Sequence, residues 1–242
     1  MADFDATLED VLAGAAQGGV NDSTAVSMSD LVNSFKDIWR NERYAPELLP
    51  EKMYVVDCLL DQIKQKEADA SALQQGAAGT VDRDACTLIR LECSRIRFMI
   101  SNYLRCRLAK IEDFCMYLKQ LPANEQSVRL SRPEMVYLYG LVEKIEEHLK
   151  SSIGLFLPPG IGVLDDRSGW YKTPTRPKMD MFIIAKPREE LAQVRLDDRV
   201  LPGRVEHEDL QAGGQYLLRY TSIRDYIFTD DEHILKAKAI LM

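Results

Sequence analysis

Histidines and adjacent aspartates are the residues of this sequence whose types could support acid–base or metal chemistry. His148, His207 and His233 are widely separated and do not form a ligand set with metal-binding spacing. The aspartate pairs lie in polar, turn-like segments, where Asp stays hydrated; they are Asp165-Asp166, Asp197-Asp198 and Asp230-Asp231. Phosphate-loop, dinucleotide-binding and nucleophile-elbow motifs do not occur. We therefore predict a protein that is not an enzyme and that uses no metal or cofactor.

Arginines are the other residues that could do chemistry, and they occur within a long helical pattern from Arg90 to Leu118 that has no Gly or Pro. At about 100° per residue, the apolar residues of this stretch form one broad arc. The arc contains Ile96, Ile100, Tyr103, Leu104, Leu108, Ile111, Phe114, Cys115 and Leu118. Arg97 and Arg107 fall inside the arc. An unpaired buried guanidinium is costly, so we expect carboxylates from a neighbouring helix beside both, unless their stems extend to water.

The same cations suggest an alternative function, which is direct binding of nucleic acid. The residues concerned are Arg90, Arg95, Arg97, Arg105, Arg107 and Lys110. A binding stripe would lie on one face, whereas these arginines are scattered around the helix. The whole chain also carries a net charge of −7 and has a pI near 5.1, which opposes attraction to a phosphate backbone. The charge distribution therefore argues against this alternative.

Composition indicates a two-domain, soluble protein. The chain has 242 residues and 46% hydrophobic content, enough to bury a real core. Five cysteines form no CxxC pair and lie among apolar residues, which is typical of reduced intracellular thiols. Neither a signal peptide nor an apolar run of about 18 residues is visible.

Helical patterns dominate residues 27–153, for which we predict an α-helical bundle domain. The first helix runs from Ser27 or Ser29 to about Arg43, and the second from Glu51 to about Ala68. A flexible loop is expected at 71–79, and the third helix should run from Thr80 or Asp82 to a point before Pro122. The sequence Ser131-Arg132-Pro133-Glu134 forms a capping box and predicts a helix through about Leu149. Four long helices imply an antiparallel bundle.

Proline and glycine interrupt residues 154–178, which we interpret as a linker to a small β-rich domain at 179–242. Short β-type runs follow it at Met181–Ala185, Gln193–Leu196, Gln215–Tyr220 and His233–Leu235. A domain this small has a marginal core, so we expect it to rest on the bundle or on another chain. The predicted fold class is α+β.

Residues 1–26 have the composition of a mobile tail, with one acidic amphipathic stretch near the start. Phe4, Leu8, Val11 and Leu12 share one side of a short helix and are surrounded by acidic residues. Such a helix is too short to be stable alone and should fold only against a partner. We interpret it as a docking peptide; a frayed terminus without function is the alternative.

Several strings, spread over both predicted domains, resemble the Sld-five family of the eukaryotic GINS complex. They are IWRNERYAPELLP at Ile38–Pro50, RIRFMISNYLRCRLAKIEDF at Arg95–Phe114, LSRPEM at Leu130–Met135, PKMDMFII at Pro177–Ile184 and YLLRYTSIRDYI at Tyr216–Ile227. The family's architecture, a helical domain followed by a small β domain, agrees with the division made above. The terminal AKAILM extends beyond the expected end of a typical member, as an added strand or a disordered end.

The resemblance implies a non-catalytic structural subunit of a nuclear heterotetramer with three sister GINS subunits. That complex joins the Cdc forty-five protein and the MCM ring in the CMG replicative helicase, so DNA contact would be indirect. FDATLEDVL at the start is similar to the short box by which some members bind the trimeric Ctf-four adaptor, which assigns that contact to Phe4, Leu8, Val11 and Leu12. We predict that a further set of residues forms a subunit interface or pairs within the core: Trp39, Glu42, Tyr44, Arg97, Tyr103, Arg105 and Arg107.

Overall fold

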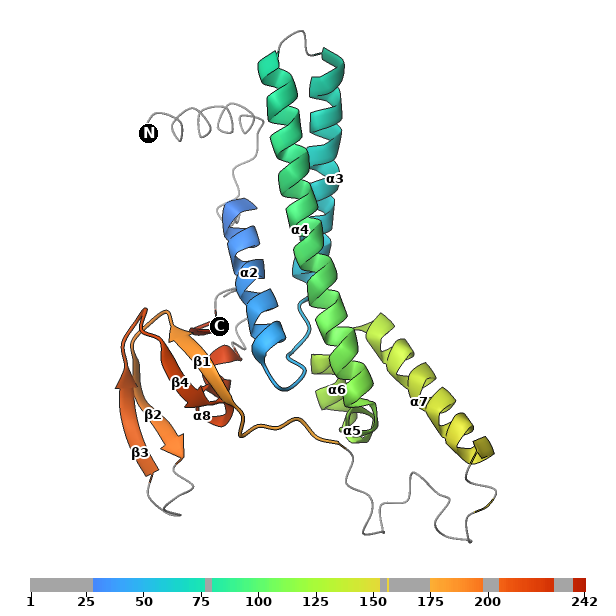
Figure 1. Ribbon diagram of the computed structural model, residues 1–242, viewed down its shortest axis with the longest axis vertical. Coiled ribbons are helices and arrows are strands. Elements are labelled where there is room, and N and C mark those ends of the chain that lie inside the picture. Colours follow the sequence, from blue (N-terminus) through green and yellow to red (C-terminus); the bar gives the residue numbers. More distant parts are fainter. Residues whose placement is uncertain (1–27, 77–79, 153–155, 157–174, 198–204, 229–236) are drawn as a thin grey trace.

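A computed structural model describes residues 28–76, 80–152, 156, 175–197, 205–228 and 237–242. The predicted tail at 1–26, most of the predicted linker at 154–178 and the predicted strand His233–Leu235 lie outside these ranges. The fold is α+β, as predicted, with helices in the first part of the chain and a small antiparallel strand region in the last (Figure 1).

Two long helices form the tallest part of the molecule. Helix α3 (Met53–Gly76) and helix α4 (Thr80–Asp113) run antiparallel as a hairpin, and α2 (Met28–Tyr44) packs beside their lower halves (Figure 1). Their shared core contains Phe35 of α2, Leu59 of α3 and Tyr103 of α4, all fully buried. Phe35 and Tyr103 meet edge to face, with ring centroids 5.6 Å apart.

The second helix continues through the residues where a flexible loop was expected, as far as Gly76. Ala and Gln are good helix formers, and buried Ala70 packs opposite Cys86, whose thiol bonds to the Ala70 carbonyl at 3.4 Å. The third helix does not reach Pro122 unbroken. Phe114 leaves helical geometry at φ −114° and ψ 19°, and the chain resumes as α5 (Cys115–Gln120).

A second core lies below the hairpin, where α5, α6 (Ala123–Arg129) and α7 (Arg132–Ser152) pack against the end of α4. Helix α6 was not predicted. Helix α7 extends away from the α3–α4 hairpin and so does not complete a regular four-helix bundle (Figure 1). A capping box consists of two hydrogen bonds. One of them is present, in which the Ser131 backbone N–H donates to Glu134 Oε2 at 2.9 Å.

The strands form two small antiparallel sheets. Strands β4 (Tyr216–Arg219), β1 (Phe182–Pro187) and β5 (Ala239–Leu241) form one in the order β4-β1-β5, and β2 (Leu191–Asp197) pairs with β3 (Val205–Leu210) in the other. Strand β3 and helix α8 (Tyr220–Ile227) were not predicted. Tyr220, placed in a predicted strand, instead begins α8. The terminal residues form β5, so the added-strand alternative is correct.

The core of the strand region is completed by residues from the helical part. Ala45 and Leu49, in the connector between α2 and α3, are buried together with Ile183, Val194 and Ile223 of the strand region. Helix α2 also lies against β5 (Figure 1). The strand region therefore rests on the helices of its own chain.

Candidate interface site

Arg107 of α4 is fully buried at the meeting point of the helices. Its Nε and Nη2 donate to the two carboxylate oxygens of Glu134 on α7 at 2.7 and 2.9 Å, and its Nη1 donates to Glu42 Oε2 on α2 at 3.2 Å. The remaining donors reach the carbonyl oxygens of Leu49 at 3.0 Å and Arg129 at 2.6 Å. All five N–H groups of a guanidinium are thus used. Arg107 joins α2, α4, α6, α7 and the α2–α3 connector.

Glu42 is held by a second cation of α4. Lys110 Nζ donates to Glu42 Oε1 at 2.7 Å, to the Glu42 carbonyl, and to the Glu47 carbonyl at 2.9 Å. Arg107 and Lys110 are one helical turn apart, so both reach the end of α2. The two cations balance the charges of Glu42 and Glu134. A buried cluster without net charge avoids the cost of an uncompensated ion.

Glu47 of the connector links the helices to the strand region. It is fully buried and accepts from Arg129 of α6 at 2.8 Å, from Arg224 of α8 at 2.6 and 3.2 Å, and from the Tyr220 hydroxyl at 2.9 Å. Arg129 also donates to the Leu48 carbonyl at 2.9 Å. The connector is therefore fixed on one side by the helical part and on the other by α8.

Burial and pairing oppose each other in these carboxyl groups. Burial alone would raise the pKa of Glu47 and of Glu134, but hydrogen bonds from Arg224 and Arg129 to Glu47, and from Arg107 to Glu134, bring both pKa values below their usual range. Both groups are therefore held as carboxylates. Burial raises the pKa of the Tyr220 hydroxyl, and the neighbouring Glu47 charge raises it further, so Tyr220 remains a donor.

Helix α2 holds the last strand through side chains. The Asn41 Oδ1 accepts from the Leu241 backbone N–H at 2.9 Å, and its Nδ2 donates to the Ala239 carbonyl at 3.4 Å. Asp37, one turn earlier, pairs with Arg188 just after β1. The Asn41 side-chain amide thus bonds to one N–H and one carbonyl of β5, as the backbone of a neighbouring strand would.

The outer side of α4 carries an apolar ridge. Leu88, Leu91 and Phe98 leave 57, 67 and 63% of their surfaces exposed. Together with Arg95 and Asn102 they follow each other at alternating steps of three and four residues, which is the spacing of a helix seam. We call Leu88, Leu91 and Phe98 the α4 ridge. Arg95 lies between Leu91 and Phe98 in this row, and large exposed apolar residues beside an arginine are typical of a protein interface.

The predicted site residues of α2 have different environments. Trp39 is half-buried, and its Nε1 donates to Asn102 Oδ1 at 2.8 Å. Glu42 is buried in the cluster, whereas Tyr44 is 44% exposed, with the Arg43 guanidinium 5.8 Å from its ring centroid. Pairing within the core is thus observed for Glu42. A subunit-interface role for Trp39 and Tyr44 stays a prediction.

The predicted site residues of α4 divide between interior and surface. Arg107 and Tyr103 are buried. Arg97 has a carboxylate partner, Glu67 of α3, but the pair is exposed, with 48 and 38% of the side-chain surfaces accessible. The expectation that Arg97 lies on a packed face is therefore wrong, because the described elements that cover this part of α4, α2 and α3, bury only a narrow arc of it. Arg105 is exposed. Phe4, Leu8, Val11 and Leu12 lie outside the described residues.

Sequence reasoning missed the central position of Glu47 and the ionic role of Glu134. Glu134 was assigned only as a helix cap. A signal for Glu47 exists, because it is a charged residue within the otherwise apolar run between Tyr44 and Leu49. Its partners Tyr220 and Arg224 are one turn apart on a helix that was not predicted, so the sequence could not identify them.

The cations proposed for nucleic-acid binding are mostly engaged by protein groups. Arg107 is inaccessible, and Lys110 is bound to Glu42. Arg95 and Arg97 pair with Glu92 and Glu67, and Arg90 donates to Gln74 Oε1 at 2.5 Å. These contacts do not favour a nucleic-acid surface on α4. Within the described ranges, no cluster of three His, Cys, Asp or Glu residues is arranged to hold a metal ion, and no helix could cross a membrane.

Comparison with known proteins gives one family throughout. The family model described as Sld5, GINS complex protein helical bundle domain, matches residues 61–153. DNA replication complex GINS protein SLD5 of Xenopus laevis is 29% identical over 219 residues, covering 89% of this chain and 95% of that protein. The human protein of the same name is 27% identical over 214 residues, covering 87% and 91%. Its Schizosaccharomyces pombe counterpart is 29% identical over 205 residues, covering 82% and 90%.

Proposed function

This chain belongs to the Sld5 family of GINS proteins, and we propose that it acts as a structural, non-catalytic subunit of a GINS complex in DNA replication. Its partners would be three sister GINS subunits, assembled in the nucleus. Through that assembly it would connect the Cdc forty-five protein and the MCM ring in the replicative helicase, during both initiation and elongation. Its contact with DNA would be indirect.

The α4 ridge is the observation that carries this proposal. Leu91 and Phe98 are more than 60% exposed on a helix whose opposite side is firmly packed. Burying apolar surface contributes about 25 cal/mol per Å², so covering the ridge with a partner helix would stabilise an assembly. The ridge lies on regular helix, so it needs little ordering upon binding.

Co-purification of charge-introducing variants would test the proposal. We expect Leu91→Glu/Phe98→Glu to fold, because surface substitutions usually change stability by no more than about 0.5 kcal/mol. It should nevertheless fail to co-purify with the three sister subunits after co-expression, because two carboxylates would have to be desolvated.

Ser94→Glu/Ser101→Glu is the matched control. Both serines are exposed on α4, have the same seven-residue spacing, and lie about a quarter turn away from the ridge. The control adds the same two charges to the same helix. Equal retention of the sister subunits by both variants, at equal helical content in circular dichroism, would contradict the proposal.

For the predicted tail motif we further propose binding to the trimeric Ctf-four adaptor. The support is the acidic amphipathic spacing of Phe4, Leu8, Val11 and Leu12. A labelled peptide of residues 1–16 should bind the adaptor in a fluorescence anisotropy titration. Binding that is unaffected by a Phe4→Ala/Leu8→Ala change would refute this assignment.

A further inference from the structure

The outer face of the sheet β4-β1-β5 is apolar and exposed. Phe182 and Ile184 of β1 and Leu217 of β4 leave 57, 44 and 68% of their surfaces accessible. The strand register places Ile184 opposite Leu217 and Phe182 opposite Arg219. The Arg219 guanidinium lies 4.7 Å from the Phe182 ring centroid. This half of the face therefore combines large apolar side chains with a cation.

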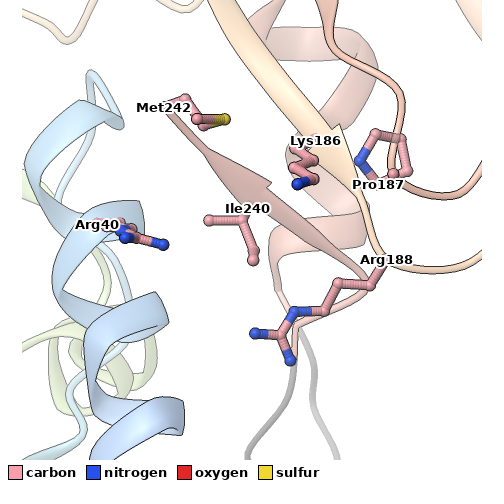
Figure 2. Close-up of a pocket in the computed structure, with 7 residues that line it drawn as sticks. Arg40, Lys186, Pro187, Arg188, Ile240 and Met242 are labelled. Carbon is pink, nitrogen blue, oxygen red and sulfur yellow. The ribbon is translucent and has the colours of Figure 1, made fainter. Parts of the chain in front are cut away.

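The other half of the same face leads into a cavity of about 360 Å³ between the sheet and α2. Lys186 lies opposite Ile240 in the register, and side chains alternate along a strand, so Lys186 shares a face with Phe182 and Ile184. Figure 2 shows Arg40 of α2 and Lys186 of β1 on either side of Ile240, with Arg188 at the edge. We call Phe182, Ile184, Leu217 and this cavity the outer sheet face.

Of the three cations that line the cavity, one is paired with a carboxylate and two are not, within the part of the chain that the structure describes. Arg188 pairs with buried Asp37. Arg40 and Lys186 have no ion-pair partner among the described residues, although Asp37 also feels the Arg40 charge. Two unpaired cations beside Ile240 create a positive potential over an apolar floor. The chemistry that fits this surface is an acidic amphipathic segment, whose apolar side covers the sheet while its carboxylates meet the cations.

We propose that the occupant is the chain's own N-terminal segment, residues 1–16. Phe4, Leu8, Val11 and Leu12 supply an apolar side in its sequence, and Asp3, Asp5, Glu9 and Asp10 supply the carboxylates. Charge and apolar content therefore complement the outer sheet face. The proposal does not rest on the GINS assembly proposed above, but it uses the same residues as the proposed adaptor contact, so the two contacts would exclude each other.

Chain length permits this contact. Residues 17–27 connect the segment to α2 and can span up to about 37 Å when extended. Helix α2 has 17 residues and is therefore about 25 Å long, and it lies against β5 at the edge of the same face. Covalent connection gives the segment an effective concentration of about millimolar near the sheet, so even weak contacts populate the docked state. Docking would also withhold the segment from other proteins.

Zero-length carbodiimide cross-linking of the full-length protein, read by mass spectrometry, would test the proposal, because it joins a lysine amine to a carboxylate only in direct contact. We expect a link between Lys186 and an acidic residue within 3–10. Lys119 and Glu146, 2.7 Å apart between α5 and α7, provide an internal reference link. The Lys186 link should weaken at 1 M salt, where the Debye length is about 3 Å.

Two matched double variants test the role of the apolar side. Phe4→Asp/Leu8→Asp should reduce the Lys186 link by more than about tenfold, because burial of even one Leu side chain accounts for that factor. Ala2→Asp/Ala6→Asp adds equal charge on the opposite side of the segment and should retain the link. Absence of the link while the Lys119–Glu146 link forms would overturn the proposal. So would its persistence in Phe4→Asp/Leu8→Asp, or its formation between isotopically heavy and light copies in a mixture.

Discussion

Replacing Arg107 by Met is the sharpest test of the buried ionic cluster. Methionine preserves much of the side-chain length but removes all five hydrogen bonds. Glu42 retains Lys110, whereas Glu134 keeps only the Ser131 backbone N–H. Removing one partner of a buried ion pair costs about 3–5 kcal/mol, because the remaining charge is uncompensated. We expect the free energy of unfolding to fall by about that amount, which corresponds to more than a hundredfold in the folding equilibrium.

Arg97→Met is the control for this experiment. It makes the same substitution on the same helix, and Arg97 also pairs with a glutamate, but that pair is exposed. An exposed pair contributes about 0–1 kcal/mol. Urea unfolding of both variants, followed by circular dichroism, would measure the difference. Equal losses of stability, or no loss for Arg107→Met, would refute the view that Arg107 fixes the helices through its partners.

The pH dependence of Arg107→Met gives a second measure of the same cluster. In the native protein the pKa of Glu134 is lowered, so its stabilising contribution is present above its unfolded pKa of about 4.3 and is lost as the pH falls through the folded pKa. Without Arg107, burial is expected to raise this pKa, and protonation then relieves the unpaired charge. The stability gap between the native protein and Arg107→Met should therefore narrow between pH 7 and pH 4. A gap that widens in acid would contradict this.

Three further outcomes are expected. Glu47→Gln should loosen α8 and leave the upper α3–α4 hairpin unchanged, because Glu47 is the shared partner of Arg224 and Arg129; hydrogen exchange read by mass spectrometry would show faster exchange in α8. Asn41→Ala should lower stability by about 1–3 kcal/mol in urea unfolding, because the buried Leu241 N–H loses its acceptor, whereas Asn33→Ala on the exposed side of α2 should change little. The native protein should lose stability steeply below about pH 4.3, since the lowered pKa values of Glu47 and Glu134 mean that the unfolded state binds more protons there; a flat profile from pH 5 to 3 would disprove this.

Helix periodicity predicted the long elements because their apolar arcs are covered by neighbouring helices. The positions of α2 and most of α4 followed from such arcs, as did the burial of Ile96, Ile100 and Ile111. Periodicity did not predict α6, where the sequence is largely polar, and Gln126 is buried because its side-chain amide donates to the Leu118, Lys119 and Leu121 carbonyls. Capping of a neighbouring helix end by a side chain leaves no periodic signal.

The pairing of Arg107 was predictable in kind but only partly in detail. A guanidinium at an apolar position required a carboxylate, and Glu42 belonged to the predicted interface or pairing set, but the sequence alone did not pair it with Arg107. Glu134 could not be identified as a partner of Arg107 from the sequence, since this pairing depends on the orientation of α7 relative to α6. Strand β3 was missed because strand preference in a half-exposed sheet depends on the cross-strand neighbours, which the sequence does not give. Helix α8 was missed because it begins at Tyr220, directly after the last residue of β4, without an intervening turn.

The two halves of α4 explain why one helix carries both a buried ionic cluster and an exposed apolar ridge. At its lower end, α4 is surrounded by α2, the connector, α6 and α7, so Arg107 finds partners in several directions. Above α2, the described element that covers α4 is mainly α3, and Leu88, Leu91 and Phe98 are exposed on the side away from this packing. A two-helix hairpin can bury only one side of each helix. The cluster below fixes the orientation of α4, and the ridge is exposed among the described residues, as the proposed interface requires.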